Sequence, residues 1–191
     1  MNWITYNPDE TTDGFECRYK IEDKTLFVLS YGANSFWDWM YCIFGAFLKP
    51  KKVYNGKYEE QVYSFHRKWY YWAFRFFRNI RKHDFNKIKF RGHSMGGVVN
   101  DIIVFLLENY SQRILELPLF NLKYGSPKPC RKGYIPGINY FNRGDFIPCL
   151  PPWYKRNHRE ILNKKWRPVW VAHSQYKWQF EDNGEVSLTD E

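Results

Sequence analysis

Short apolar runs alternate with stretches of helical spacing along most of the chain. Residues 15–21 mix apolar and polar positions, and residues 25–30 carry the continuous apolar run that is typical of a buried strand. The polar residues 22–24 between them predict a hairpin turn. Three later segments with strand-like composition follow, at residues 87–90, 119–124 and 138–141.

The spacing of apolar residues predicts helices in the segments between these strands. Residues 36–48 form an apolar stretch that ends at the Lys-Pro-Lys-Lys of residues 49–52. Residues 58–82 predict one long helix, with apolar positions three and four apart. We assign structural or solvated roles to His66 within it and to His83 at its end. Residues 98–110 predict another helix with an apolar core face. Strands that alternate with helices indicate an α/β fold with a mainly parallel central sheet and helices on both faces.

The length of 191 residues suits a single domain, residues 1–191, with a core at about 24–180 between an acidic N-terminal segment and a C-terminal tail. The longest apolar run, residues 36–48, contains Asp38 and is shorter than the ~20 residues that a bilayer-spanning helix needs. The N-terminus lacks the basic start and apolar stretch of a secretory signal. We therefore expect a cytoplasmic protein by default, with peripheral membrane contact as the alternative.

Charge is distributed unevenly along the chain. Of 29 bases and 20 acids, residues 1–23 hold two bases and six acids, and residues 181–191 hold five acids and no base. The middle therefore keeps 27 bases against 9 acids, a net charge of +18. Such a surplus attracts anionic partners, with an anionic membrane as the favoured one and nucleic acid less so. The four cysteines lie far apart, which predicts reduced thiols and neither a metal site nor a redox pair.

Gly92-His93-Ser94-Met95-Gly96 stands between a predicted strand and a predicted helix. A Gly-x-Ser-x-Gly sequence in that setting is typical of a nucleophile elbow, because side chains at the flanking positions would clash with neighbouring backbone. Ser94 is therefore the candidate nucleophile.

A serine hydroxyl needs a base to take its proton and an acid to orient that base. In the α/β-hydrolase fold class both follow the serine along the chain. Asp145 lies just after a predicted strand and is the candidate acid. Two histidines follow it. His158 lies in a densely charged stretch and His173 follows an apolar segment, so His173 is the favoured base and His158 remains the alternative.

Several motifs in a consistent order resemble those of the class 3 (fungal-type) lipases. The segment 30–35 followed by Asp38-Trp39 is similar to the family's Phe-Arg-Gly-Thr-x-Ser and Asp-Trp, and residues 53–58 resemble a weakened Val-His-x-Gly-Phe. Residues 92–97 resemble its Gly-His-Ser-Leu-Gly-Gly, and residues 124–127 its Tyr-Gly-Ser-Pro. Residues 142–152 resemble the family's Asn-x-x-Asp-x-Val-Pro-x-Leu-Pro-Pro. The similarity covers residues 24–180.

The resemblance implies a role for each candidate residue. It makes Asp145 the catalytic acid and His173, in a segment similar to Asp-His-x-x-Tyr, the base, while His158 falls on a structural strand. It places the oxyanion hole at the backbone N–H groups of Ala33 and Met95, with Ala33 at a position where the family usually has Thr or Ser.

Three functions are consistent with these features. The first is a lipase or phospholipase that cleaves lipid esters through an acyl-enzyme at an anionic surface. The second is an esterase or thioesterase for soluble substrates, and the third is a binding protein on a hydrolase scaffold, for membrane or nucleic acid. None of the three implies a metal or an organic cofactor. Residues 36–48 could supply a lid over a lipid site, and a buried core helix is the alternative for them.

Overall fold

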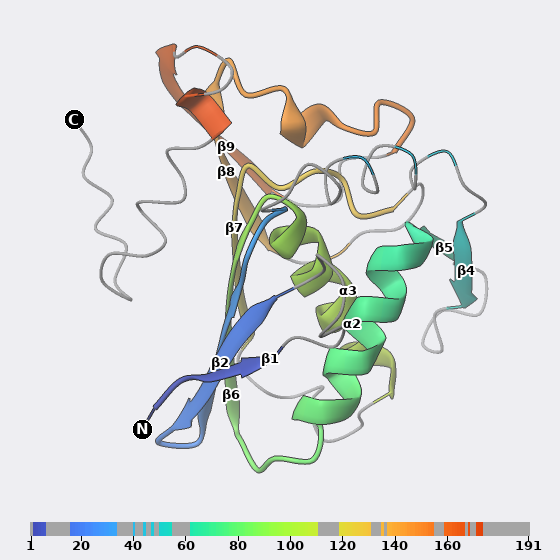
Figure 1. Ribbon diagram of the computed structural model, residues 1–191, viewed down its shortest axis with the longest axis vertical. Helices are drawn as coiled ribbons and strands as arrows, with labels where there is room; N and C mark the ends of the chain where they lie inside the picture. The colour runs from blue at the N-terminus through green and yellow to red at the C-terminus, as the bar shows by residue number, and fades with distance from the viewer. Residues whose placement is uncertain are drawn as a thin grey trace.

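A seven-stranded sheet organises the chain in the computed structural model (Figure 1). Its strands run in the order β1 (Ile4–Tyr6), β2 (Cys17–Glu22), β3 (Thr25–Ser30), β6 (Lys87–His93), β7 (Leu119–Tyr124), β8 (Ile138–Arg143) and β9 (Arg159–Trp166). A separate two-stranded sheet pairs β4 (Lys51–Tyr54) with β5 (Val62–Phe65). The structure describes residues 2–6, 16–33, 40, 44, 47, 50–54, 62–110, 119–130, 135, 137–154, 159–166, 168 and 171–173.

The large sheet is mainly parallel, as expected. The five strands from β3 to β9 in this order run parallel to one another, while β1, β2 and β3 pair antiparallel. The turn between β2 and β3 has both Asp23 and Lys24 at positive φ, 49° and 55°. Two such residues give the turn whose twist matches a tight hairpin, which confirms the predicted connection.

Two long helices, α2 (Arg67–Ile80) and α3 (Met95–Tyr110), pack against each other on one face of the sheet (Figure 1). Helix α3 lies between α2 and the sheet, and its side chains from Met95 to Leu107 are all buried. Helix α2 is amphipathic and buries its aromatic side toward α3 and the sheet. Among the described residues, the expectation of helices on both faces is therefore confirmed for this face alone.

The long helix predicted over residues 58–82 is wrong at its N-terminal end. Residues 62–65 form β5, which pairs antiparallel with β4, and the helix begins only at Arg67. The side chain of His66 caps it, since His66 Nδ1 accepts a hydrogen bond from the backbone N–H of Trp69. The helical spacing of apolar residues continued across this junction by coincidence, and pairing with β4 overrode it.

Other boundaries differ by a few residues, and four strands, β1, β4, β5 and β9, were not predicted. Helix α3 begins at Met95, three residues before the expected start, and β6 and β8 extend past their predicted ends. The short β1 and the mixed-composition β9 gave no clear pattern. Of residues 36–48, Met40, Phe44 and Phe47 are described and helical, and the rest lie outside the described residues.

A fully buried ion pair links α3 to β7. Lys123 Nζ lies 2.7 Å from Asp101 Oδ1 and 2.9 Å from Oδ2, and Asn121 donates a further hydrogen bond to Asp101. Burial raises the pKa of Asp101, and the neighbouring ammonium opposes that rise. Each charge is therefore compensated by the other where neither side chain is exposed to solvent.

No helix in the described part of the chain is long and apolar enough to cross a bilayer. Of the described cysteines, Cys17 and Cys130 are buried and Cys149 is exposed, and no disulfide joins any two of these three.

Removing one partner of the buried pair should be costly. We expect Lys123→Met to lower the free energy of unfolding by about 3–5 kcal/mol, because it leaves the Asp101 carboxylate buried without its cation. The double variant Lys123→Met with Asp101→Leu should regain much of that loss, as measured by urea unfolding. Glu22→Gln, which breaks the exposed pair with Lys20, should leave the midpoint nearly unchanged. A Lys123→Met midpoint equal to that of the wild type would contradict this assignment.

Candidate active site

Ser94 stands at a sharp corner between β6 and α3. It is the single residue between the last residue of β6, His93, and the first of α3, Met95. Its φ is +52°, in the left-handed region that residues with a Cβ rarely adopt. Its N–H donates to the carbonyl of Tyr124 on β7 at 2.9 Å, which ties the corner to the neighbouring strand.

Close backbone contacts explain the glycines on both sides of Ser94. A Cβ added at Gly92 would lie 2.5 Å from Gly97 Cα. One added at Gly96 would overlap the backbone carbonyl of Ser30 at the end of β3. Only glycine permits these approaches, since real Cβ atoms do not come so close to backbone. The predicted elbow geometry is therefore present.

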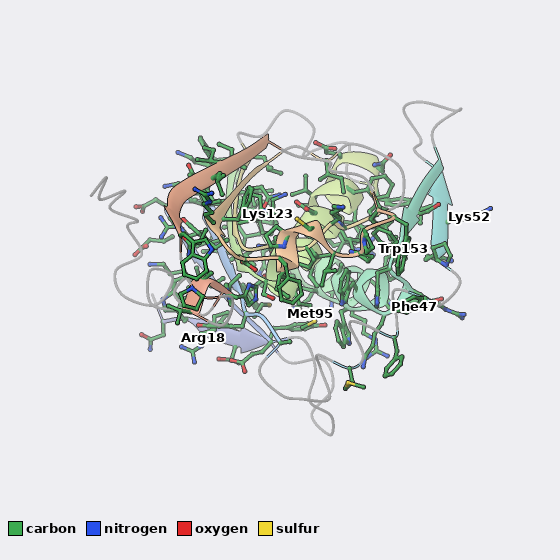
Figure 2. The ribbon with its side chains drawn as sticks, turned by 90° about the horizontal axis from the view of Figure 1, so that it is seen from above. Arg18, Phe47, Lys52, Met95, Lys123 and Trp153 are labelled. Carbon is green, nitrogen blue, oxygen red and sulfur yellow. The ribbon has the colours of Figure 1, made fainter. Side chains whose placement is uncertain are left out.

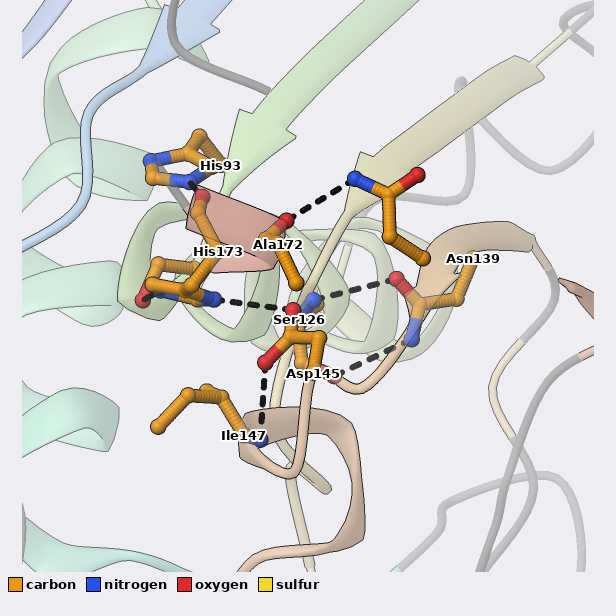
Figure 3. A network of polar contacts seen from close by, with 9 residues as sticks. His93, Ser126, Asn139, Asp145, Ile147, Ala172 and His173 are labelled. Atoms are coloured by element: carbon orange, nitrogen blue, oxygen red, sulfur yellow. Dashed lines mark hydrogen bonds and ion pairs between the residues drawn. The ribbon is translucent and has the colours of Figure 1, made fainter. Parts of the chain in front are cut away.

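The structure brings Ser94, His173 and Asp145 into one hydrogen-bonded chain (Figure 3). His173 Nε2 lies 2.9 Å from Ser94 Oγ, and His173 Nδ1 lies 2.9 Å from Asp145 Oδ2. A carboxylate only accepts, so Nδ1 carries the proton and the lone pair of Nε2 faces the serine hydroxyl. Three segments that are far apart in the sequence supply these groups. The rival histidine, His158, lies outside the described residues.

Asp145 is held in place by its own loop. Its side chain is fully buried, and its second oxygen, Oδ1, accepts a hydrogen bond of 2.9 Å from the backbone N–H of Ile147. Ile147 is the first residue of the short 3-10 helix η2 (Ile147–Cys149). The carboxylate thus has a fixed orientation, with one oxygen on the imidazole and the other on backbone.

Two side chains that the sequence did not single out bind the backbone around His173. Asn142 Nδ2 donates to the carbonyl of Ala172 at 2.8 Å, and His93 Nε2 lies 3.1 Å from the carbonyl of His173. Since a carbonyl only accepts, His93 carries a proton on Nε2. Asn142 is part of the motif that contains Asp145, and His93 is part of the elbow, but contacts to backbone far away along the chain leave no signal in one sequence.

The amide of Asn139 organises the loop after β7. It accepts from the backbone N–H of Ser126 at 3.1 Å and donates to the carbonyl of Ser126 at 3.0 Å (Figure 3). Ser126 in turn lies against Gly97 at the beginning of α3, where an added Cβ would be 2.7 Å from the serine side chain. This loop therefore supports the elbow from the side of β7 and β8.

The two predicted oxyanion positions, Ala33 and Met95, lie on different segments next to Ser94. Met95 follows it directly as the first residue of α3, with a buried side chain. Gly32, the residue before Ala33, lies against the serine, since a Cβ added there would be 2.9 Å from Ser94 Cβ. Ala33 is half-buried and comes next along the chain.

Burial raises the pKa of Tyr124, which lies beneath Ser94 on β7, to about 12, so its hydroxyl stays protonated at neutral pH. Within the described ranges, no three His, Cys, Asp or Glu side chains gather as a metal site requires.

Comparison with solved structures relates this geometry to known folds. The lipase from Rhizopus microsporus var. chinensis matches 87% of this chain with a TM-score of 0.62 and 18% sequence identity. Lipase II from Rhizopus niveus matches 78% with a TM-score of 0.56 and 16% identity. A fungal lipase–inhibitor complex, described as a model for interfacial activation in lipases, matches 78% with a TM-score of 0.51 and 18% identity. No protein-family sequence model matches the chain, and neither does any curated protein sequence.

The chain has a lipase-like α/β-hydrolase fold. It spans 60–62% of the length of the two Rhizopus lipases and 61% of the inhibitor-bound lipase, so it matches only part of each. In this lipase-like fold the elbow serine, the buried carboxylate and the histidine meet at the carboxyl ends of the parallel strands, where ligands bind in open α/β sheets.

The strained backbone at Ser94 should affect the free energy of unfolding of variants at this position. Ser94→Gly should be more stable than Ser94→Ala by about 1 kcal/mol, because both lose the hydroxyl but only glycine adopts positive φ without a steric cost. Urea unfolding of the two variants measures this difference. The same pair of substitutions at Ser64, on β5, should rank in the opposite order, since glycine weakens a strand. Equal stabilities of the two Ser94 variants would contradict the elbow conformation.

Proposed function

We propose that this chain is a serine hydrolase that cleaves carboxylic esters of lipids. The observation that carries the proposal is the hydrogen-bonded chain from Ser94 Oγ through His173 to the buried Asp145, with Ser94 at a strained elbow. A base within 2.9 Å of a serine hydroxyl, itself oriented by a carboxylate, is the arrangement that activates such a nucleophile.

The proposed reaction is acyl transfer in two steps. Ser94 Oγ attacks the ester carbonyl while His173 takes its proton, and the resulting imidazolium passes that proton to the leaving alcohol. Water then attacks the acyl-enzyme, with His173 again as base, and releases the acid. Asp145 keeps the imidazole in the tautomer that accepts at Nε2 and stabilises its positive charge. The negative oxygen of each tetrahedral intermediate is bound by the backbone N–H groups of Ala33 and Met95.

Exposed aromatic side chains favour lipid over a soluble ester. Phe47 and Trp153 are 66% and 43% exposed, and their rings contact each other with centroids 4.8 Å apart (Figure 2). Phe146, directly beside Asp145, is half exposed as well. Exposed aromatic side chains of this kind can insert at a lipid interface, and the inhibitor complex with a similar fold is described in terms of interfacial activation. The net charge of +18 over residues 24–180 favours anionic lipids.

The first test concerns the catalytic groups. Ser94→Ala and His173→Ala should each lower the turnover of a short-chain ester by about 10³-fold or more while the protein stays folded, since both remove the nucleophile–base pair. His83→Ala, at the end of α2, is the matched histidine control and should retain activity. His158→Ala should also retain turnover. If His158→Ala abolishes hydrolysis and His173→Ala does not, the two histidines exchange roles.

The second test concerns the lipid interface. Trp153→Ala and Phe47→Ala should lower hydrolysis of anionic vesicles about tenfold, since fully burying such a side chain contributes ~1.5–3 kcal/mol. Their kcat/KM for a soluble short-chain ester should be unchanged. Tyr110→Ala is the matched control, because that exposed aromatic ends α3 about 22 Å from its first turn. Equal losses on vesicles and on the soluble ester would favour the esterase function, and no ester hydrolysis at all would favour a binding protein.

A further inference from the structure

The face of the sheet turned away from α2 and α3 carries two rows in which basic and apolar side chains alternate from strand to strand. One row runs across β2, β3, β6 and β7 through Lys20, Phe27, Lys89 and Phe120. The other runs through Arg18, Leu29, Arg91 and Leu122. Residues paired across strands project to the same side of a sheet, so each row forms a continuous strip.

These strips present charge and apolar surface together. The ammonium groups of Lys20 and Lys89 lie 5.3 and 5.2 Å from the centre of the Phe27 ring, and that of Lys87 lies 5.4 Å from the Phe120 ring. Phe120 is 51% exposed.

On this face, β2 and β6 carry five bases, and Glu16 and Glu22 are the acids beside them. Glu22 pairs with Lys20 at 2.6 Å, and Glu16 approaches Arg18 at 4.0 Å. The bases that have no such acid beside them in these two pairs are Lys87, Lys89 and Arg91, which lie along β6. The surface therefore suits an anionic segment that also has apolar side chains.

Residues 174–191 have the complementary composition. Tyr176, Trp178 and Phe180 alternate with polar residues, which gives an extended segment one aromatic side. Residues 181–191 then carry five acids and no base.

This segment also begins beside the end of β6, because it follows His173 directly. The carbonyl of His173 lies 3.1 Å from His93 Nε2, and His93 ends the same row of β6 that holds Arg91, Lys89 and Lys87. From His93 to Lys87 the strand covers about 20 Å. Eight extended residues from His173 to Glu181 reach at most ~26–29 Å, so the first acids can reach the far end of the row.

We propose that residues 174–191 bind this face of the sheet. The aromatic side of the segment packs on Phe27, Leu29 and Phe120, and its carboxylates pair with Lys20, Lys87 and Lys89. The segment thereby masks a surface that would otherwise attract anionic partners. The proposal does not depend on the hydrolase activity.

Zero-length carbodiimide cross-linking of the full chain tests this contact, followed by peptide mapping of the monomer band. Cross-links should join Glu181, Asp182 or Glu185 to Lys20, Lys87 or Lys89. Their yield should fall about tenfold when ionic strength rises from 0.1 to 1 M, since that rise shortens the screening length from ~10 to ~3 Å. The exposed Lys52 and Lys82, which lie outside the strands of this face, are the matched control positions and should give few such links.

A charge swap separates specific pairing from general attraction. Lys87→Glu with Lys89→Glu should abolish the links to β6. Adding Glu181→Lys with Glu185→Lys should restore links between the same positions, now from amines at 181 and 185 to carboxylates at 87 and 89. Lys89 is exposed and Lys87 partly exposed, so the fold should tolerate the changes at these two positions. Links spread evenly over the control lysines would overturn the proposal. Links found only in dimers would assign the face to a second copy of the chain.

Discussion

The close approach of α3 to the end of β3 is the constraint on which the candidate site depends. Gly96 lies against the carbonyl of Ser30, and Gly92 lies against Gly97, so neither contact leaves room for a side chain. The chain can make this turn only if Ser94 adopts positive φ, and its N–H is then bound by the carbonyl of Tyr124. The strained position of the serine is thus a consequence of how the helix enters the sheet.

The other two groups of the site come from loops that are fixed to the same sheet end. Asp145 is oriented by the N–H of Ile147, while the backbone before and at His173 is bound by Asn142 and His93. Because β6 and β8 are tied together by the strand between them, a displacement of either would separate the serine from the imidazole. The buried pair of Asp101 and Lys123 joins α3 to that intervening strand, β7.

The sequence predicted the features that depend on local pattern. The strand 25–30, the hairpin before it, the strand 119–124 and the Gly-x-Ser-x-Gly corner were all found where expected, since each depends on residues close together along the chain, although only one face of the strand 25–30 is fully buried. The predicted start of the helix that contains α2 was wrong, because residues 62–65 pair with β4 as strand β5. This contact between different segments overrode the helical spacing of the apolar residues. The preference for His173 over His158 came from the apolar segment before His173 and was strengthened by the family resemblance. The roles of Asn142 and His93 were not predictable, since both bind backbone carbonyls through contacts between distant residues.

The central claim is that Ser94 is an activated nucleophile, and covalent labelling tests it most directly. The folded chain would be treated with a fluorophosphonate, which phosphonylates activated serine hydroxyls, and the site of attachment would be mapped by mass spectrometry. We predict a single phosphonyl group on Ser94, lost when the protein is first unfolded in urea, because activation needs the 2.9 Å contact with His173. A folded protein that takes up no label, or takes it up at a different serine, would contradict this account.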